Sequence, residues 1–259
     1  MRFGICTGPE NRGALAEAGY DYIELTVAGA LQPEKPEEDA LPPLRAAFAL
    51  PGVKPEAYNV LLPGDLKVVG PETDAARQER YLEAAFARAA SLGGKVAVFG
   101  SGAARGIPAG WPLEEAQGQV REFLGRGGAA AARHGMVIAI EPLNVTECNF
   151  INSVAEAVAL AREVNHPAVA VLSDLYHVDH DGQSYEETRE AAPLLRHVHV
   201  AGEGRRAPTP EDHAFLRDYF AVLKASGYDE RVSIEGSWED LGAQAAGALG
   251  VLRRAWEEA

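Results

Sequence analysis

The order of apolar segments constrains the fold of this chain more than any other feature of its sequence. Short apolar runs typical of buried β-strands recur eight times, at residues 2–6, 22–25, 57–62, 95–99, 136–141, 168–173, 196–200 and 231–235. Alanine-rich stretches with helical spacing lie between them, at residues 77–92, 113–133, 154–164, 213–225 and 241–256. Successive βα units of this number close naturally into a parallel barrel. We therefore expect an α/β protein with one (β/α)8 TIM barrel domain over residues 1–259.

Local signals support this alternation. Ser153 with Glu156 and Ser184 with Glu187 have the spacing of a helix capping box, and Thr209 precedes a proline. A doubly wound open sheet is the rival arrangement, but the segment after the first run, TGPENRG, matches the dinucleotide-binding fingerprint poorly. The proline-rich and acidic stretch 32–43 is interpreted as a solvated loop or an irregular helix, not as a domain boundary.

Composition and charge exclude several classes of partner. The chain has 24 basic and 38 acidic residues, and its formal net charge of -14 opposes binding to the phosphate backbone of nucleic acids. It contains no apolar run of about eighteen residues that could span a bilayer. The N-terminus lacks an export signal, and Cys6 and Cys148 form no metal or disulfide pattern. We expect free thiols and a cytoplasmic protein without nucleic-acid or membrane partners.

Polar residues stand at the ends of the last four predicted strands, where a barrel strand should otherwise be apolar. They are Glu141, Asp174, His199 and Glu235. Three carboxylates beside one imidazole would repel each other strongly unless a cation lay between them. Mixed oxygen and nitrogen ligands suit a divalent ion, with Mn²⁺ favoured and Mg²⁺, Co²⁺ or Zn²⁺ as alternatives. The pattern predicts one divalent metal ion held by these four residues.

Two histidines on the seventh predicted strand compete for the metal. His197 and His199 are two residues apart and face the same side of the strand, with valines between and after them facing the helices. We assign the ligand role to His199 because it lies nearer the C-terminal mouth. His197 is then a buried hydrogen-bonding residue.

Four segments, EPLNVTE, DLYH, HVHVAGEGR and IEG, resemble the xylose isomerase-like barrel superfamily. They are most similar to the ketose 3-epimerases related to D-tagatose 3-epimerase and to sugar-phosphate isomerases and epimerases. The resemblance spans nearly the whole chain and is strongest from Val137 onward. It implies metal ligands at the same four positions, and it implies that Glu141 and Glu235 are the two acid/base catalysts.

The same resemblance implies three substrate-binding residues. In those epimerases a glutamate, a histidine and an arginine follow the metal ligands of strands five, six and seven by six, three and six residues. Glu147, His177 and Arg205 stand at the matching positions here. Each has a simpler interpretation as well: Glu147 as a loop carboxylate, His177 as a packing or capping residue, and Arg206 in place of Arg205.

The expected activity is a metal-dependent sugar isomerase or epimerase that moves a proton next to a ketone through an enediolate. Its partner would be a small sugar or polyol, slightly favoured as unphosphorylated because no phosphate-binding loop is visible. The alternatives are a keto-inositol isomerase, an inosose dehydratase or a hydroxypyruvate-type isomerase. More distant ones are an AP-endonuclease-like nuclease and a non-catalytic sugar-binding barrel. The sequence leaves open whether the chain forms a homo-oligomer.

Three further residues lie near the ends of the second and third predicted strands. Glu24, Tyr58 and Asn59 are candidates for the pocket wall or for ordinary hydrogen bonding.

Overall fold

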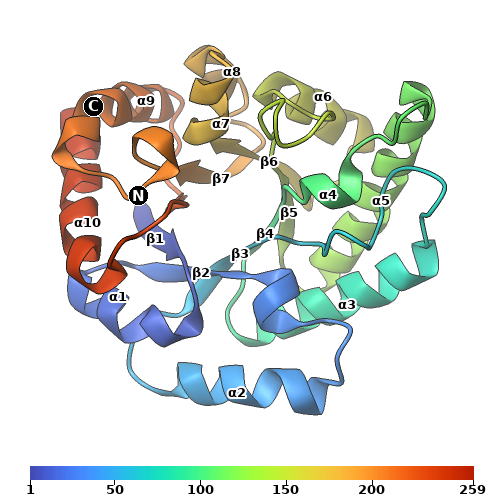
Figure 1. Ribbon diagram of the computed structural model, residues 1–259, viewed down its shortest axis with the longest axis horizontal. Helices are drawn as coiled ribbons and strands as arrows, with labels where there is room; N and C mark the ends of the chain where they lie inside the picture. Colours follow the sequence, from blue (N-terminus) through green and yellow to red (C-terminus); the bar gives the residue numbers. More distant parts are fainter.

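Eight parallel strands form a closed barrel in the computed structural model, which describes all residues from 1 to 259 (Figure 1). Each strand pairs with the next along the chain, and the last pairs with the first. The expected (β/α)8 barrel is therefore confirmed. The strands are β1 (Arg2–Cys6), β2 (Tyr22–Thr26), β3 (Pro55–Asn59), β4 (Val96–Phe99), β5 (Val137–Ile140), β6 (Val169–Asp174), β7 (Leu195–Val200) and β8 (Arg231–Ile234).

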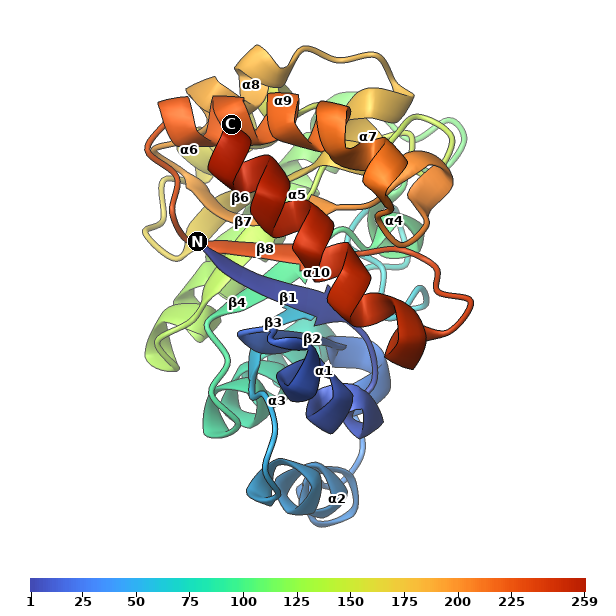
Figure 2. The same ribbon diagram turned by 90° about the vertical axis from the view of Figure 1, so that its left-hand side faces the viewer.

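Helices surround this barrel and connect its strands. Figure 2 shows the last of them, α10, crossing outside β1 and β8. The α-helices are α1 (Arg12–Ala18), α2 (Glu37–Ala49), α3 (Ala75–Ser91), α4 (Gly102–Arg105), α5 (Leu113–Arg133), α6 (Val154–Val164), α7 (Leu175–His180), α8 (Tyr185–Glu190), α9 (His213–Ala225) and α10 (Leu241–Glu258). Shorter helical turns are η1 (Pro9–Asn11), η2 (Val27–Leu31), η3 (Glu203–Arg205) and η4 (Pro210–Asp212). None of these helices combines the length and the apolar character that crossing a membrane requires.

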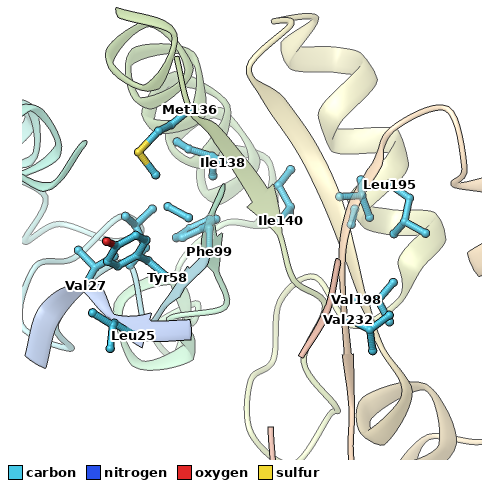
Figure 3. Close-up of a cluster of buried hydrophobic side chains, with 14 of the residues drawn as sticks. Leu25, Val27, Tyr58, Phe99, Met136, Ile138, Ile140, Leu195, Val198 and Val232 are labelled. Carbon is cyan, nitrogen blue, oxygen red and sulfur yellow. The ribbon is translucent and has the colours of Figure 1, made fainter. Parts of the chain in front are cut away.

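The larger apolar core lies between the barrel and its helices. Alternate residues of each strand point outward, so that Ile138 and Ile140 on β5 face the helix layer. Figure 3 shows them in the same apolar layer as Phe99 of β4 and Val198 of β7. All four side chains are fully buried. This layer fixes the inward direction of the intervening residues, which determines what the barrel interior contains.

The barrel interior holds a smaller apolar cluster at its lower levels. Its members are Tyr22, Ala57, Val96, Val98, Ala139 and Leu172. The Tyr22 ring occupies the space beside Gly4 of β1, where any Cβ atom would collide with the ring. Glycine at this position therefore lets a large aromatic side chain fill the barrel centre. Polar side chains occupy the interior above this cluster, toward the C-terminal ends of the strands.

Several element boundaries differ from the sequence-based expectation. The third strand ends at Asn59 and not at residue 62, because Val60 adopts a left-handed conformation with φ of 46°. The stretch 32–43 is only partly a loop, since α2 begins at Glu37 and includes two exposed prolines. Acidic residues in its first turn and buried residues at helical spacing, among them Leu41 and Leu44, favour this helix.

The predicted helix starts are confirmed, with altered details. Ser153 accepts a hydrogen bond from the Glu156 backbone N–H at 3.1 Å and begins α6. Ser184 begins α8 in the same way but accepts from the backbone of Glu186. Thr209 forms a complete capping box at the start of η4. These caps fix the residue at which each helix begins after its loop.

Candidate metal centre and active site

The four residues predicted as metal ligands meet at the C-terminal mouth of the barrel. One ligand atom from each of Glu141, Asp174, His199 and Glu235 lies within 4.8 Å of all the others. Nδ1 of His199 is 3.2 Å from Oε1 of Glu141 and 3.5 Å from Oε2 of Glu235. The chain separates these residues by 33, 25 and 36 positions. Only closure of the barrel brings them together.

Strand register accounts for this convergence. Asp174 of β6 pairs with His199 of β7, and His199 pairs with Ser233 of β8, two residues before Glu235. These positions share the inward face because side chains alternate along a strand. Room for Glu141 comes from Gly100, which follows β4, since a Cβ atom on Gly100 would collide with Oε2 of that carboxylate.

Two buried polar atoms at the cluster have no hydrogen-bond partner. Oδ1 of Asp174 accepts from the Tyr176 backbone N–H at 2.9 Å, whereas Oδ2 of Asp174 is unpaired. Nε2 of His177 is also unpaired and lies 3.6 Å from that oxygen. Buried polar groups are rarely left without partners in proteins. A free carboxylate oxygen within this set of three carboxylates and one imidazole fits a divalent cation.

Burial and mutual repulsion shift the ionisation of the clustered groups. Burial raises the pKa of Asp174 to about 7 and also raises the pKa of Glu141, and the charge of Glu235 adds to both shifts. For Glu235, burial is outweighed by the positive charges of His199 and Arg205, which lower its pKa to about 2. For His199, burial is outweighed by nearby carboxylates, which hold its pKa well above the ordinary value. Asp174 and Glu141 thus resist ionisation in the absence of a cation, and a bound cation would favour their charged forms.

His177 and Glu147 are connected through a residue that the sequence analysis did not identify. Nδ1 of His177 accepts hydrogen bonds from the backbone N–H and the side-chain amide of Asn144, at 3.2 and 2.9 Å. The hydrogen of the neutral ring must then lie on Nε2. The Asn144 amide also donates to Oε1 of Glu147 at 3.1 Å. Asn144 thus orients two of the three predicted substrate-binding side chains, a role that only the loop conformation reveals.

The two adjacent arginines after β7 bind different partners. Arg205 Nη1 donates to Oε1 of Glu147 at 3.1 Å, and Arg205 Nη2 donates to Oε2 of Glu235 at 2.6 Å. Arg206 instead donates to Oδ2 of Asp212 at 2.6 Å, away from the cluster. The predicted residue, Arg205, is therefore the one that the fold brings to the site.

A pocket of about 310 Å³ opens above the cluster. Its polar lining includes Glu141, Glu235 and Arg205, and its apolar lining includes Leu62 and Leu143. Ligands of small-molecule size commonly occupy concave sites of this volume. The pocket gives a small substrate access to both predicted acid/base residues.

The candidates on the second and third strands have three different environments. Asn59 lines the pocket and donates to Oε1 of Glu235 at 2.8 Å. Tyr58 points outward and donates to the Ala89 carbonyl, so it is not a pocket residue. Glu24 is fully buried beneath the cluster and bonds to His197 and His199.

Arg105 is a further residue that sequence reasoning missed. Its guanidinium is fully buried and donates to four backbone carbonyls, including those of Phe99 at 2.8 Å and Glu141 at 2.8 Å. It therefore ties the ends of β4 and β5 to each other at the base of the site. No local motif marks this role, because its partners are all backbone atoms.

Comparisons with known proteins find similarity to sugar epimerases. The chain is 27% identical over 137 residues to a ketose 3-epimerase of Arthrobacter globiformis, covering 52% of this chain and 47% of that relative. It is 34% identical over 113 residues to the 3-dehydro-D-guloside 4-epimerase of Escherichia coli (strain K12), covering 41% of this chain and 40% of the relative. The aligned regions thus span less than half the length of these curated relatives.

The fold has close counterparts among solved structures. A crystal structure of D-psicose 3-epimerase in the presence of D-fructose superposes with a TM-score of 0.84 at 20% identity, covering 99% of each chain. At this identity the similarity concerns the fold. In addition, the sequence profile of the xylose isomerase-like TIM barrel family matches residues 13–255, which is nearly the whole chain. The chain therefore belongs to the xylose isomerase-like TIM barrel family.

Proposed function

We propose that this protein is a divalent-metal-dependent sugar epimerase or isomerase. It acts on an unphosphorylated ketose or a related polyol by moving a proton on the carbon next to a ketone. We further propose that residues 1–259 form one domain that functions in the cytoplasm. The names of the relatives, both of which are sugar epimerases, support a substrate of this class.

One observation carries the proposal: two glutamates, an aspartate and a histidine converge beside a pocket of about 310 Å³. Glu141 and Glu235 reach the pocket from β5 and β8, which are separated by two strands on the barrel circumference. Carboxylates that approach a substrate from two directions suit removal of a proton from one face and return of a proton to another. Return to the opposite face inverts the carbon, whereas return to the neighbouring carbon interconverts aldose and ketose.

The metal would be held by Glu141, Asp174, His199 and Glu235. When bound, the cation would supply a fixed positive charge that stabilises negative charge developing on the substrate carbonyl oxygen. Mn²⁺ is the ion we favour because three carboxylates and one imidazole form a predominantly oxygen donor set. Metal analysis of the purified protein tests this identity.

The remaining polar residues orient the substrate. His177 presents an Nε2–H that has no partner in the protein and can donate to a substrate oxygen. Arg205 and Glu147 form an ion pair at the pocket rim and offer one donor group and one acceptor group to hydroxyls. Asn59 holds the Glu235 carboxylate from the other side, which limits the positions that this catalytic group can adopt.

Proton NMR of reactions in deuterium oxide tests the proposal directly. The Mn²⁺-loaded protein is incubated with ketoses, keto-inositols, 3-keto-glycosides and their phosphates, and the metal is removed before spectra are recorded. Epimerisation keeps the ketose, isomerisation moves the carbonyl, and dehydration produces an enone. Ligand binding without deuterium incorporation would instead identify a non-catalytic sugar-binding barrel. Release of abasic-site fragments from duplex DNA would identify a nuclease.

Substitution of the two acid/base residues sharpens the test. Glu141→Gln and Glu235→Gln should each slow deuterium incorporation by about 10²- to 10⁴-fold, the usual contribution of a positioned acid or base. Glu163→Gln, on the outer helix α6, should leave the rate unchanged. Exchange at the parental rate in both active-site variants would refute the assigned roles.

A further inference from the structure

A carboxylate that is not part of the predicted metal set lies directly beneath it. Glu24 projects from β2 into the barrel interior and is fully buried. Its Oε1 is 3.0 Å from Nε2 of His199, and its Oε2 is 2.7 Å from Nε2 of His197. Burying a charged carboxylate is costly unless donors surround it. Its position under a predicted metal ligand therefore requires an explanation.

The two nitrogens of the His199 ring face opposite surroundings. Nδ1 points toward Glu141 and Glu235, at 3.2 and 3.5 Å, whereas Nε2 points toward Glu24. An ionised carboxylate only accepts hydrogen bonds, so the hydrogen between Nε2 and Glu24 belongs to the ring. A histidine that binds a metal must present a lone pair on its coordinating nitrogen. Glu24 thus keeps a hydrogen on Nε2, so that Nδ1, which faces Glu141 and Glu235, is the nitrogen that would give up its hydrogen and coordinate.

We propose that Glu24 is a positioning residue that fixes the tautomer and the ring orientation of His199 for metal binding. This inference rests on the metal site of the proposed function. Metal-bound histidines generally donate their second N–H to a carboxylate or carbonyl, which increases the basicity of the ligand nitrogen and sets its direction. Here the carboxylate comes from β2, a strand that supplies none of the four predicted ligands and is separated from β8 by β1.

The rest of the interior network holds Glu24 in place. Ser233 donates to Oε2 of Glu24 at 2.5 Å and lies 2.8 Å from the Tyr22 hydroxyl. His197 donates to the same oxygen, Oε2. Two donors thus occupy one carboxylate oxygen, and the other oxygen, Oε1, remains for His199. The residues stand on the rigid strands β2, β7 and β8, so the carboxylate cannot easily turn away.

A purely structural role makes a different prediction. If Glu24 only satisfied buried donors, its replacement would lower the stability of the metal-free protein and leave the metal affinity unchanged. If Glu24 sets the His199 tautomer, the affinity changes even in a variant that folds normally. Metal affinity measured apart from catalysis therefore separates the two roles.

The experiment uses the full chain and MnCl₂ as the probe in isothermal titration calorimetry. Glu24→Gln keeps the size of the side chain but can place an amide N–H opposite Nε2 of His199, which would force the ring hydrogen onto Nδ1. We expect the dissociation constant for Mn²⁺ to rise about 10- to 100-fold. Ser233→Ala removes one of the two donors to Oε2 of Glu24 but leaves the carboxylate opposite His199, so it should raise the constant less than Glu24→Gln does.

A second control removes a carboxylate at the opposite end of the barrel. Glu56 of β3 pairs with Arg2 and Arg231, and Glu56→Gln should bind Mn²⁺ as the parent does. Thermal unfolding of each metal-free variant reports whether it folds. Unchanged affinity in Glu24→Gln, or equal weakening in Glu24→Gln and Ser233→Ala, would overturn the inference. A parent chain that binds no divalent ion would overturn the proposed metal site and the inference together.

A measurement on the parent protein keeps the inference testable if Glu24→Gln does not fold. In the Zn²⁺-loaded protein with ¹⁵N-labelled histidine, long-range ¹H–¹⁵N spectra should show the His199 hydrogen on Nε2. Assignment follows from loss of the signals in His199→Gln. A hydrogen on Nδ1 in the loaded protein would place the metal on the other nitrogen and contradict the role of Glu24.

Discussion

Arg205 and Glu235 are joined by a 2.6 Å hydrogen bond between Nη2 and Oε2 across the barrel mouth. The guanidinium also contacts Glu147 at 3.1 Å and lies over the Tyr176 ring, 4.8 Å from its centroid. One side chain thus links a proposed acid/base residue to a proposed substrate-binding residue. Its planar shape lets both bonds form while the aromatic ring supports one face.

Replacement of Arg205 by lysine should impair catalysis while preserving the fold. Lysine keeps the charge but cannot bridge Glu147 and Glu235 with two fixed donors. Loss of one hydrogen bond between charged groups costs about 1.5–3 kcal/mol, which corresponds to a fall in kcat/KM of roughly 10- to 100-fold. Steady-state kinetics measure this fall. Arg206→Lys is the matched control and should retain kcat/KM; equal losses in the two variants would contradict the role of Arg205.

Gly100→Ala should damage the site with little effect on stability. The added methyl group would occupy the position of Oε2 of Glu141, and that carboxylate would have to move. Misplacement of a catalytic group by an ångström can reduce the rate by about 100-fold. Deuterium incorporation into the substrate measures the rate, and thermal unfolding measures the stability. Gly125→Ala on α5 meets open space and should keep full activity, so comparable losses in both variants would refute this explanation.

Metal binding should stabilise the protein more at high pH than at low pH. In the metal-free protein burial raises the pKa of Asp174 to about 7, compared with about 3.9 in an unfolded chain. Between these values the folded state binds more protons, so its stability falls as the pH rises. A cation binds the ionised form of the ligands, so its binding offsets this loss of stability at high pH. The increase in Tm on addition of MnCl₂ should therefore be larger at about pH 8 than at about pH 5.5.

The corresponding control is Asp174→Asn, which removes this titrating group. Its metal-free Tm should depend less on pH than that of the parent over the same interval. Differential scanning calorimetry provides both comparisons. A Mn²⁺-induced increase in Tm that is independent of pH would contradict the assignment of Asp174 as a ligand that must lose a proton.

Val60→Asn should stabilise the protein. Val60 directly follows Asn59, has a φ of 46° and is 44% exposed, so a β-branched residue occupies a strained conformation with little packing benefit. Left-handed backbone costs about 1–2 kcal/mol for such residues, and asparagine tolerates it better. We expect a gain of about 1 kcal/mol, or roughly 2–4 °C in Tm for a chain of this size. Val145→Asn, also exposed but without a positive φ, should change stability by less than about 0.5 kcal/mol.

The sequence by itself determined the barrel and the identity of the converging residues. Apolar runs of strand length alternated with helical stretches, and this order leaves few architectures other than a closed parallel barrel. Strand-end positions and the two-residue periodicity then placed Glu141, Asp174, His199 and Glu235 on one inner face. These inferences succeed because they depend on local backbone geometry, which the residue order encodes directly.

The tertiary structure decided which neighbours those residues have. Arg205 and not Arg206 reaches the site because the loop after β7 turns through two left-handed residues, Gly204 and Arg205. No sequence motif predicts this conformation. Asn144 and Glu24 acquired roles only when loops and opposite strands met around them. Such contacts join residues far apart in the sequence, and their geometry depends on the register and closure of the whole barrel. No local pattern contains that information.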